Sequence, residues 1–368
     1  MRIALVSDCY PPRMGGIETQ VSHLAARLRR QGHAVCVLTV TPGPDEHGVW
    51  RLAALRHGPP MNPWAAPALR RAFVGADVVH IHLGVWAPFA QLAADLATAA
   101  AIPTVLTWHS LVGASPLTPV VRRRWRRWIT AGAVPTAVSR EAASQLADAL
   151  GTALDSTDQI SILPNGIDAG RWMPETRSAQ TSPVRVASAM RFTARKRPMG
   201  LVAMMLHVRT ALPGDQRPRL VICGDGPLLT PLRAVVAASS LREWVELPGR
   251  LSAQALAQVY RTSNLYVAPA RHEAFGIAAL EATAAGLPVL GYAGSGVRDI
   301  IGPQAQPTGW LVESDRELIA LLISLCSRPM QLQQATAKLR SRPQVQHDWS
   351  SVTQRSVALY RRAVARTS

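Results

Sequence analysis

Two glutamates stand eight positions apart around the expected start of a helix. Glu273 and Glu281 belong to the segment RHEAFGIAALEATAAGLPVL, which follows the strand-like NLYVAPA. The helix should begin near Gly276 and end at Gly286, ahead of Pro288. Carboxylates placed in this way could hold two sets of ligand hydroxyls. On spacing alone, Glu273 could equally be a loop charge and Glu281 an ordinary helix residue.

Two expected helix starts offer backbone N–H groups to a ligand. Phe275, Gly276 and Ile277 present such groups to a phosphate or sugar oxygen. Gly15 and Gly16, in PPRMGGIE, would allow close backbone approach at the first strand–helix turn. The pattern G-x-G-x-x-G is absent at this turn, which disfavours a nicotinamide or flavin dinucleotide site and therefore a dehydrogenase.

A basic cluster follows the strand-like VRVASAM. Arg191, Arg195, Lys196 and Arg197 lie within MRFTARKRP, at the carboxyl end of that strand, where doubly wound domains bind ligands. Protein cations there could neutralise a diphosphate in place of a metal ion. The alternative is a solvated basic loop, although Lys196 stands out in a chain that otherwise nearly always uses arginine.

Three histidines close or occupy strand-like runs. His109 ends PTVLTWHS and could present a hydrogen-bonding group to a ligand. His80 and His82 share one face of a strand, which could suggest a metal site. No third ligand stands at a telling spacing, so we expect neither a metal nor a resident cofactor.

Composition limits the remaining possibilities. A length of 368 residues suggests about two domains, and 48% apolar residues indicate a globular chain. Forty basic against 23 acidic residues leave a formal charge of +17, which calls for an anionic partner. No nucleic-acid motif appears, so membrane surfaces and phosphorylated ligands are favoured. Scattered cysteines and the lack of a long apolar segment predict a cytoplasmic protein.

Strand and helix patterns alternate along the chain. IALVSDCY reads as a strand, the segment from Ile17 to Gly32 as an amphipathic helix and HAVCVLTV as a second strand. This βαβ unit implies a parallel sheet, and similar units continue to a polar, turn-rich stretch near 171–183. A second alternating set follows, so we predict an α/β chain of two doubly wound domains.

In combination, these motifs resemble family 4 of the retaining, GT-B-fold glycosyltransferases. The resemblance rests on the opening unit together with TWHS, AVS, ILPNGID, MRFTARK, VICGDGPL, LPGRLS, EAFGIAALEATAAGLPVL and a closing helix with Trp349 and Tyr360. It implies two Rossmann-like domains facing a cleft. The first would be an acceptor domain at 1–170, with helix 348–368 packing back on it. The second, at 183–347, would bind a nucleotide sugar without an essential metal.

The resemblance also implies roles for single residues. Arg191 and Lys196 would hold the donor diphosphate, which the turn at Gly16 would approach. Glu273 would contact the sugar hydroxyls and Glu281 the ribose.

Further donor contacts are implied by the same resemblance. The amides of 275–277 would bind sugar and phosphate oxygens, Arg250 and Leu251 would lie against the base, and His109 would sit beside the reacting sugar. The chain departs from the family pattern at Met190, where glycine is usual, and at Arg197–Pro198, which replaces the glycine after the lysine. Residues 295–299, SGVRD, also lack the proline that the family usually has before the acidic position.

A basic segment rich in tryptophan bears on the acceptor. VVRRRWRRWITAG could form a helix on an anionic membrane through Arg123, Arg124, Trp125, Arg127 and Trp128. The segment 51–73 is a second basic, tryptophan-containing stretch. The alternative is an ordinary solvated helix with its tryptophans packed inward.

We therefore predict a retaining glycosyltransferase that moves a sugar from a UDP- or GDP-sugar to a lipid-linked or polysaccharide acceptor, as a peripheral protein at the cytoplasmic membrane face. The opening unit and TWHSLVG also resemble, more weakly, the N-acetylglucosaminyltransferase subunit that starts glycosylphosphatidylinositol anchors. Two alternatives stay open. One is transfer to a small soluble acceptor such as an inositol or a sugar, and the other is a non-catalytic membrane- or polyanion-binding protein with the same fold.

Overall fold

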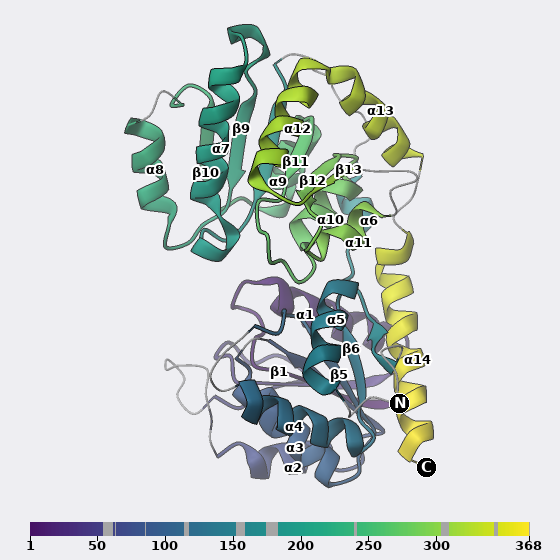
Figure 1. Cartoon of the computed structure of the whole chain (residues 1–368). Helices are drawn as coiled ribbons and strands as arrows, with labels where there is room; N and C mark the ends of the chain where they lie inside the picture. Colours follow the sequence, from purple (N-terminus) through teal and green to yellow (C-terminus); the bar gives the residue numbers. More distant parts are fainter. Residues whose placement is uncertain are drawn as a thin grey trace. The chain divides into compact units, whose positions relative to one another are not determined.

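The structure is a computed structural model that describes residues 1–53, 62, 64–84, 86–113, 118–151, 159–173, 183–238, 241–302, 309–341 and 345–367. The chain divides into two compact units (Figure 1). Unit 1 contains Met1–Gly166 and Gln346–Ser368, and unit 2 contains Ile167–Val345. The centre of the predicted polar stretch, 174–182, and residues 54–61 and 63 of the second basic stretch lie outside the described residues.

Unit 1 is built on a seven-stranded parallel sheet in the order β3-β2-β1-β4-β5-β6-β7. Its strands are β1 (Arg2–Ser7), β2 (Ala34–Thr39), β3 (Val49–Arg51), β4 (Val78–Leu83), β5 (Thr104–Trp108), β6 (Val134–Ala137) and β7 (Ser161–Ile162). Its helices are α1 (Gly16–Arg30), α2 (Ala66–Phe73), α3 (Pro88–Ala99), α4 (Thr118–Thr130), α5 (Arg140–Leu150) and α14 (Trp349–Thr367). In the first βαβ unit, the helix α1 and its flanking strands β1 and β2 occur where the sequence pattern predicts them.

The last helix belongs to the core of unit 1. Trp349 and Tyr360 of α14 are buried with Leu5 of β1 and Val21 of α1 in one apolar cluster. The Tyr360 hydroxyl also lies 2.8 Å from His80 Nδ1, so the helix is held by a buried polar contact as well as by apolar packing.

Unit 2 is built on a six-stranded parallel sheet in the order β10-β9-β8-β11-β12-β13. The strands are β8 (Arg185–Ala189), β9 (Arg219–Cys223), β10 (Val245–Gly249), β11 (Leu265–Val267), β12 (Val289–Tyr292) and β13 (Gly309–Val312). Its helices are α6 (Ala169–Trp172), α7 (Pro198–Ala211), α8 (Leu229–Ala238), α9 (Ala253–Arg261), α10 (Ile277–Ala284), α11 (Val297–Ile301), α12 (Asp315–Ser327) and α13 (Pro329–Arg340). Parallel pairing throughout confirms the predicted α/β class.

The strand order of unit 2 changes direction between two neighbours. From β8 the chain runs outward to β9 and β10, and then returns to place β11 on the other side of β8. Loops that leave β8 and β11 at their carboxyl ends therefore diverge from a shared point in the sheet. In doubly wound folds this point is where ligands bind.

Candidate functional site

The loops after β8 and β11 bring two predicted site residues together. Lys196 Nζ donates a hydrogen bond to Glu273 Oε2 in an ion pair, although the residues are 77 positions apart. Both side chains are only partly exposed. A lysine and a carboxylate at the β8/β11 switch point form a polar centre that can bind an anion and a hydroxyl-rich group side by side.

One buried apolar side chain and two glycines determine the path of the loop after β8. Phe192 is fully buried, and its backbone N–H donates to Asp225 O at 2.9 Å. A Cβ on Gly224 would lie 1.8 Å from Met190 O, and one on Gly226 would lie 2.7 Å from Phe192 O. Only glycine permits so close a crossing, which explains why GDG follows β9.

The other predicted cations lie around the same strand ends. Arg191 is exposed next to the buried Phe192. Arg195 donates from Nε to His272 O at 3.4 Å, and Arg250 lies 3.8 Å from Asp225. The loops after β8 and β10 thus contribute positive charge to one edge of the sheet.

Glu281 occupies a desolvated position in α10. Burial raises the pKa of its carboxyl to about 8, and the positive charge of Arg171 on α6 opposes this rise. A carboxyl in this state can lose its proton when ligand hydroxyls donate to it. The sequence alone does not indicate this role for Arg171, because nothing in its spacing ties it to α10.

The predicted amide group lies at the start of α10. Gly276 is the N-cap residue with φ of 96°, a left-handed conformation that favours glycine, and the Phe275 side chain beside it is buried. Ile277 is the first helical residue, so its N–H belongs to the first turn, whose N–H groups have no partner within the helix. Gly296 donates to Glu273 O at 2.8 Å and thereby fixes the loop that carries the glutamate.

The remaining predicted donor-binding residues are Leu251 in unit 2 and Gly15 and Gly16 in unit 1. Leu251 follows β10 and is half-buried. Gly15 is the N-cap of α1, and a Cβ there would lie 2.3 Å from the carboxylate of Glu18, which pairs with Arg13 at 3.1 Å. The helix start at Gly16 is therefore already faced by a paired carboxylate.

His109 is oriented by a second histidine. His109 Nε2 lies 2.9 Å from His82 Nδ1, and the His109 ring also bonds to the side chain of Asn165. Burial lowers the pKa of His109 to about 4, so the ring is neutral at pH 7. His80 bonds instead to Tyr360 and Thr107, which accounts for its place on the strand. Among the described residues, no three His, Cys, Asp or Glu side chains are grouped to hold a metal ion.

Comparison with known families divides the chain within a few residues of the boundary between the two units. The family model Glycosyltransferase Family 4 matches residues 14–171, and the model Glycosyl transferases group 1 matches residues 173–342. The chain belongs to the family 4 glycosyltransferases. The predicted resemblance is thereby confirmed.

Individual relatives of this glycosyltransferase agree with the family. It is 28% identical, over 85% of both chains, to the GDP-mannose-dependent alpha-(1-6)-phosphatidylinositol monomannoside mannosyltransferase of Mycobacterium tuberculosis. It is 24% identical, over the full length of both, to the MMP alpha-(1->4)-mannosyltransferase of Mycolicibacterium hassiacum. The structure of Anabaena Alr3699/HepE in complex with UDP is 15% identical and superposes with a TM-score of 0.77 over 97% of this chain and 99% of that one. The fold is GT-B.

The packing of α4, the arginine–tryptophan helix of the glycosyltransferase, does not agree with the membrane hypothesis. Trp125 and Trp128 of α4 are 8% and 1% exposed, and Trp128 Nε1 donates to Asp95 Oδ1 at 2.7 Å. Arg124 donates to the same carboxylate and to Gln91 of α3. The expectation that these tryptophans contact lipid is therefore wrong, because they form the inward face of α4.

Exposed aromatic surface occurs elsewhere in unit 1. Trp64 is 79% exposed ahead of α2, and Trp86 is 71% exposed ahead of α3. Arg123 and Arg127 remain exposed, one turn apart on the outer face of α4. Within the described residues, no helix combines the length and apolar character needed to cross a bilayer.

Proposed function

We propose that this glycosyltransferase moves a sugar from a UDP- or GDP-sugar to a lipid-linked or polysaccharide acceptor, with retention of anomeric configuration and without a metal ion. The observation that carries the proposal is the Lys196–Glu273 pair at the β8/β11 switch point. A nucleotide sugar presents a diphosphate and sugar hydroxyls on adjacent groups, which match a lysine and a carboxylate in contact.

Departure of the nucleoside diphosphate builds negative charge on phosphate oxygens. A cation ~4 Å away stabilises such a charge by roughly 4 kcal/mol at an effective dielectric of about 20. Lys196 and Arg191 supply two cations in the proposed site, which is how the protein would replace a metal ion. Glu273 would hold the sugar hydroxyls and, once a donor binds, share Lys196 with the phosphate.

The transition state of glycosyl transfer is oxocarbenium-like. We propose that the acceptor hydroxyl attacks from the face that the diphosphate leaves, and that a phosphate oxygen of the leaving group takes the hydroxyl proton. The bond from the anomeric carbon to the phosphate oxygen breaks as the new glycosidic bond forms, so configuration is retained. The roles of His109 and of the Gly16 turn stay predictions from the family resemblance.

Support for donor and acceptor class comes from the relatives and from unit 1. One relative is named for a GDP-mannose donor and a phosphatidylinositol-linked acceptor, and a structural neighbour was solved with UDP. Trp64 and Trp86, with Arg123 and Arg127, are the groups through which a cytoplasmic, peripheral enzyme would reach a lipid-linked acceptor.

The deciding experiment is a thermal-shift screen of UDP-, GDP- and ADP-sugars, followed by turnover assays with each stabilising donor. We expect a UDP- or GDP-sugar to stabilise the protein and to be consumed when lipid-linked glycan is supplied. Determination of the anomeric configuration of the product tests retention. Transfer only to free inositol or to a simple sugar would contradict the proposed acceptor, and binding without any turnover would contradict the enzyme assignment.

A further inference from the structure

Arg197, which follows Lys196, adopts a backbone conformation that disfavours any side chain. Its φ and ψ are 58° and 43°, and Ala101 is the only other non-glycine residue with positive φ within the described ranges. The residue is the N-cap of α7, directly ahead of Pro198, and its side chain makes no capping bond to the helix. Glycine would turn the chain here without the steric penalty of a Cβ.

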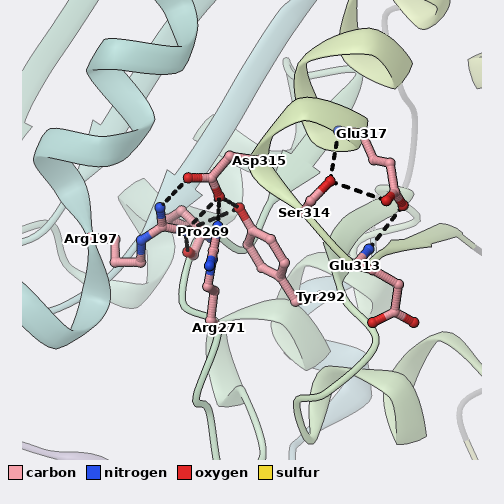
Figure 2. Close-up of polar contacts among 8 residues, drawn as sticks. All are labelled: Arg197, Pro269, Arg271, Tyr292, Glu313, Ser314, Asp315 and Glu317. Carbon is pink, nitrogen blue, oxygen red and sulfur yellow. Dashed lines mark hydrogen bonds and ion pairs between the residues drawn. The ribbon is translucent and has the colours of Figure 1, made fainter.

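The Arg197 side chain binds a carboxylate far away in the sequence. Its guanidinium donates to both oxygens of Asp315, at 3.0 and 2.6 Å, and also to Tyr292 Oη at 3.0 Å and Pro269 O at 3.1 Å (Figure 2). The Tyr292 hydroxyl donates to Asp315 as well. A planar guanidinium with four acceptors around it is held in one orientation.

Asp315 also binds the second loop of the candidate site. Arg271 Nη2 lies 3.0 Å from Asp315 Oδ1, and the guanidinium groups of Arg271 and Arg197 lie 5.5 and 5.7 Å from the centre of the Tyr292 ring. Arg271 and Pro269 belong to the segment between β11 and α10, two and four residues ahead of Glu273. One carboxylate thus joins the loops that carry Lys196 and Glu273.

The carboxylate itself is fixed by the start of α12. Ser314 is the N-cap and accepts from Glu317 N at 3.2 Å, while Glu317 accepts from Glu313 N at 3.0 Å (Figure 2). This reciprocal capping orders the first turn of α12, where a negative charge is also favoured by the helix dipole. The neighbouring guanidinium groups hold the pKa of Asp315 well below its usual range, so it stays ionised.

We propose that Arg197 and Asp315 are positioning residues that hold the Lys196 loop in register with Glu273 for donor diphosphate binding. We call Arg197, Asp315, Tyr292 and Arg271 the Asp315 clamp. The inference rests on the proposed function and deepens it, because the clamp replaces the conformational freedom of a glycine with a rigid tether. The clamp touches no substrate; it acts through Lys196.

The test compares Arg197→Gly and Asp315→Asn with Arg316→Gln, a control at the exposed residue next to Asp315. Isothermal titration measures affinity for UDP and GDP and for the corresponding nucleosides. We expect both clamp variants to bind the nucleoside diphosphate about tenfold or more weakly, because a contact to a charged group loses its geometry. Nucleoside affinity and the control should match the unaltered protein. Arg197→Gly should fold, since glycine suits this backbone.

A double-mutant cycle with Lys196→Ala separates positioning from general damage. If the clamp acts through Lys196, neither clamp change should weaken diphosphate binding further in the Lys196→Ala background. Unaltered affinity in Arg197→Gly, or an equal loss with and without Lys196, would overturn the clamp alone. If the unaltered protein bound nucleoside diphosphates but transferred no sugar, the proposed function would fail while the clamp was still tested. Failure to bind any nucleoside diphosphate would overturn both.

Discussion

The lysine at position 196 illustrates how one side chain can be ranked from sequence and then placed by structure. It is one of two lysines among forty basic residues, and the other, Lys338, is exposed on α13. Lys196 instead contacts Glu273 at the sheet switch point. A compact ammonium in this position can stabilise the negative charge that develops on a leaving diphosphate.

Lys196→Ala should therefore lower kcat more than it weakens donor binding. Loss of one preorganised electrostatic contact typically reduces kcat by about 10²–10³. Steady-state kinetics with a single nucleotide sugar measure the effect, and Lys338→Ala is the matched control that removes the same group from an exposed helix. Wild-type kcat in Lys196→Ala would assign the diphosphate charge to another cation, such as Arg195.

Glu281 should make donor binding depend on pH. Its pKa is raised from 4.5 to about 8 in the folded protein, so the folded state keeps a proton that the unfolded state loses. Its contribution to stability is thus fully present below pH 4.5 and is lost as the pH rises through about 8. Ribose hydroxyls donate best to the carboxylate, so KM for donor should fall as the pH rises through the same value.

The matching variant is Glu281→Gln, which keeps the shape of the side chain and removes its ionisable carboxyl. It should show a raised KM that is independent of pH, with kcat largely kept, because the predicted contact to ribose would be equal in ground and transition states. Glu243→Gln changes an exposed glutamate and should leave the pH profile intact. A flat KM profile in the unaltered enzyme would contradict the role of Glu281.

A site residue could be predicted from the sequence where a local sequence pattern identifies its position, and not where its contact joins distant parts of the chain. Lys196 and Glu273 each follow a recognisable strand, and parallel strands bring such loops to one edge. The Arg197–Asp315 contact spans 118 positions and has no local pattern. The shared strand face of His80 and His82 could be predicted, whereas the hydrogen bond of His82 to His109, which directly follows the neighbouring strand β5, could not.

At the scale of single elements, periodicity predicted helices better than it predicted what their faces contact. The spacing of Ile17, Val21, Leu24 and Leu28 placed α1 correctly to within a turn. For α4, the same periodicity fits a tryptophan face against protein or against lipid. Asp95 decides between them, because it pairs with Arg124 and accepts from Trp128.

Membrane binding, if the acceptor is lipid-linked, should depend on Trp64 and Trp86 and on the outer face of α4. We expect co-sedimentation with phosphatidylglycerol vesicles at low salt, weaker at high ionic strength because surface charges are screened. Trp64→Ala with Trp86→Ala, and Arg123→Gln with Arg127→Gln, should each reduce the bound fraction several-fold, at about 1 kcal/mol per arginine near the surface. Arg328→Gln with Arg340→Gln removes equal charge from exposed positions of unit 2 and is the control. Binding unaffected by the first two pairs would exclude this surface.

At the scale of the whole molecule, the positive charge of the chain has two separable uses. A net charge of +17 attracts any polyanion and raises encounter rates with anionic donors and surfaces. Only the cations at the carboxyl edge of the unit 2 sheet belong to the proposed diphosphate site, and their contribution cannot be inferred from composition. The two uses differ in their response to salt, since a bound diphosphate in a partly buried site is screened less than an exposed surface.

The proposed use of protein cations leads to a prediction about metals for the intact enzyme. If Lys196 and Arg191 neutralise the leaving diphosphate, excess EDTA should leave kcat and donor KM nearly unchanged, because no divalent ion is needed to stabilise the departing charge. Adding magnesium or manganese should also have little effect. The measurement is initial rates with and without chelator, at constant ionic strength so that screening does not change. The Lys196→Ala variant adds a sharper comparison: a divalent ion that partly restores its rate would act as a substitute for the missing ammonium. Activity of the unaltered enzyme that disappears in EDTA and returns with magnesium would instead mean that the metal, and not the lysine, carries this charge.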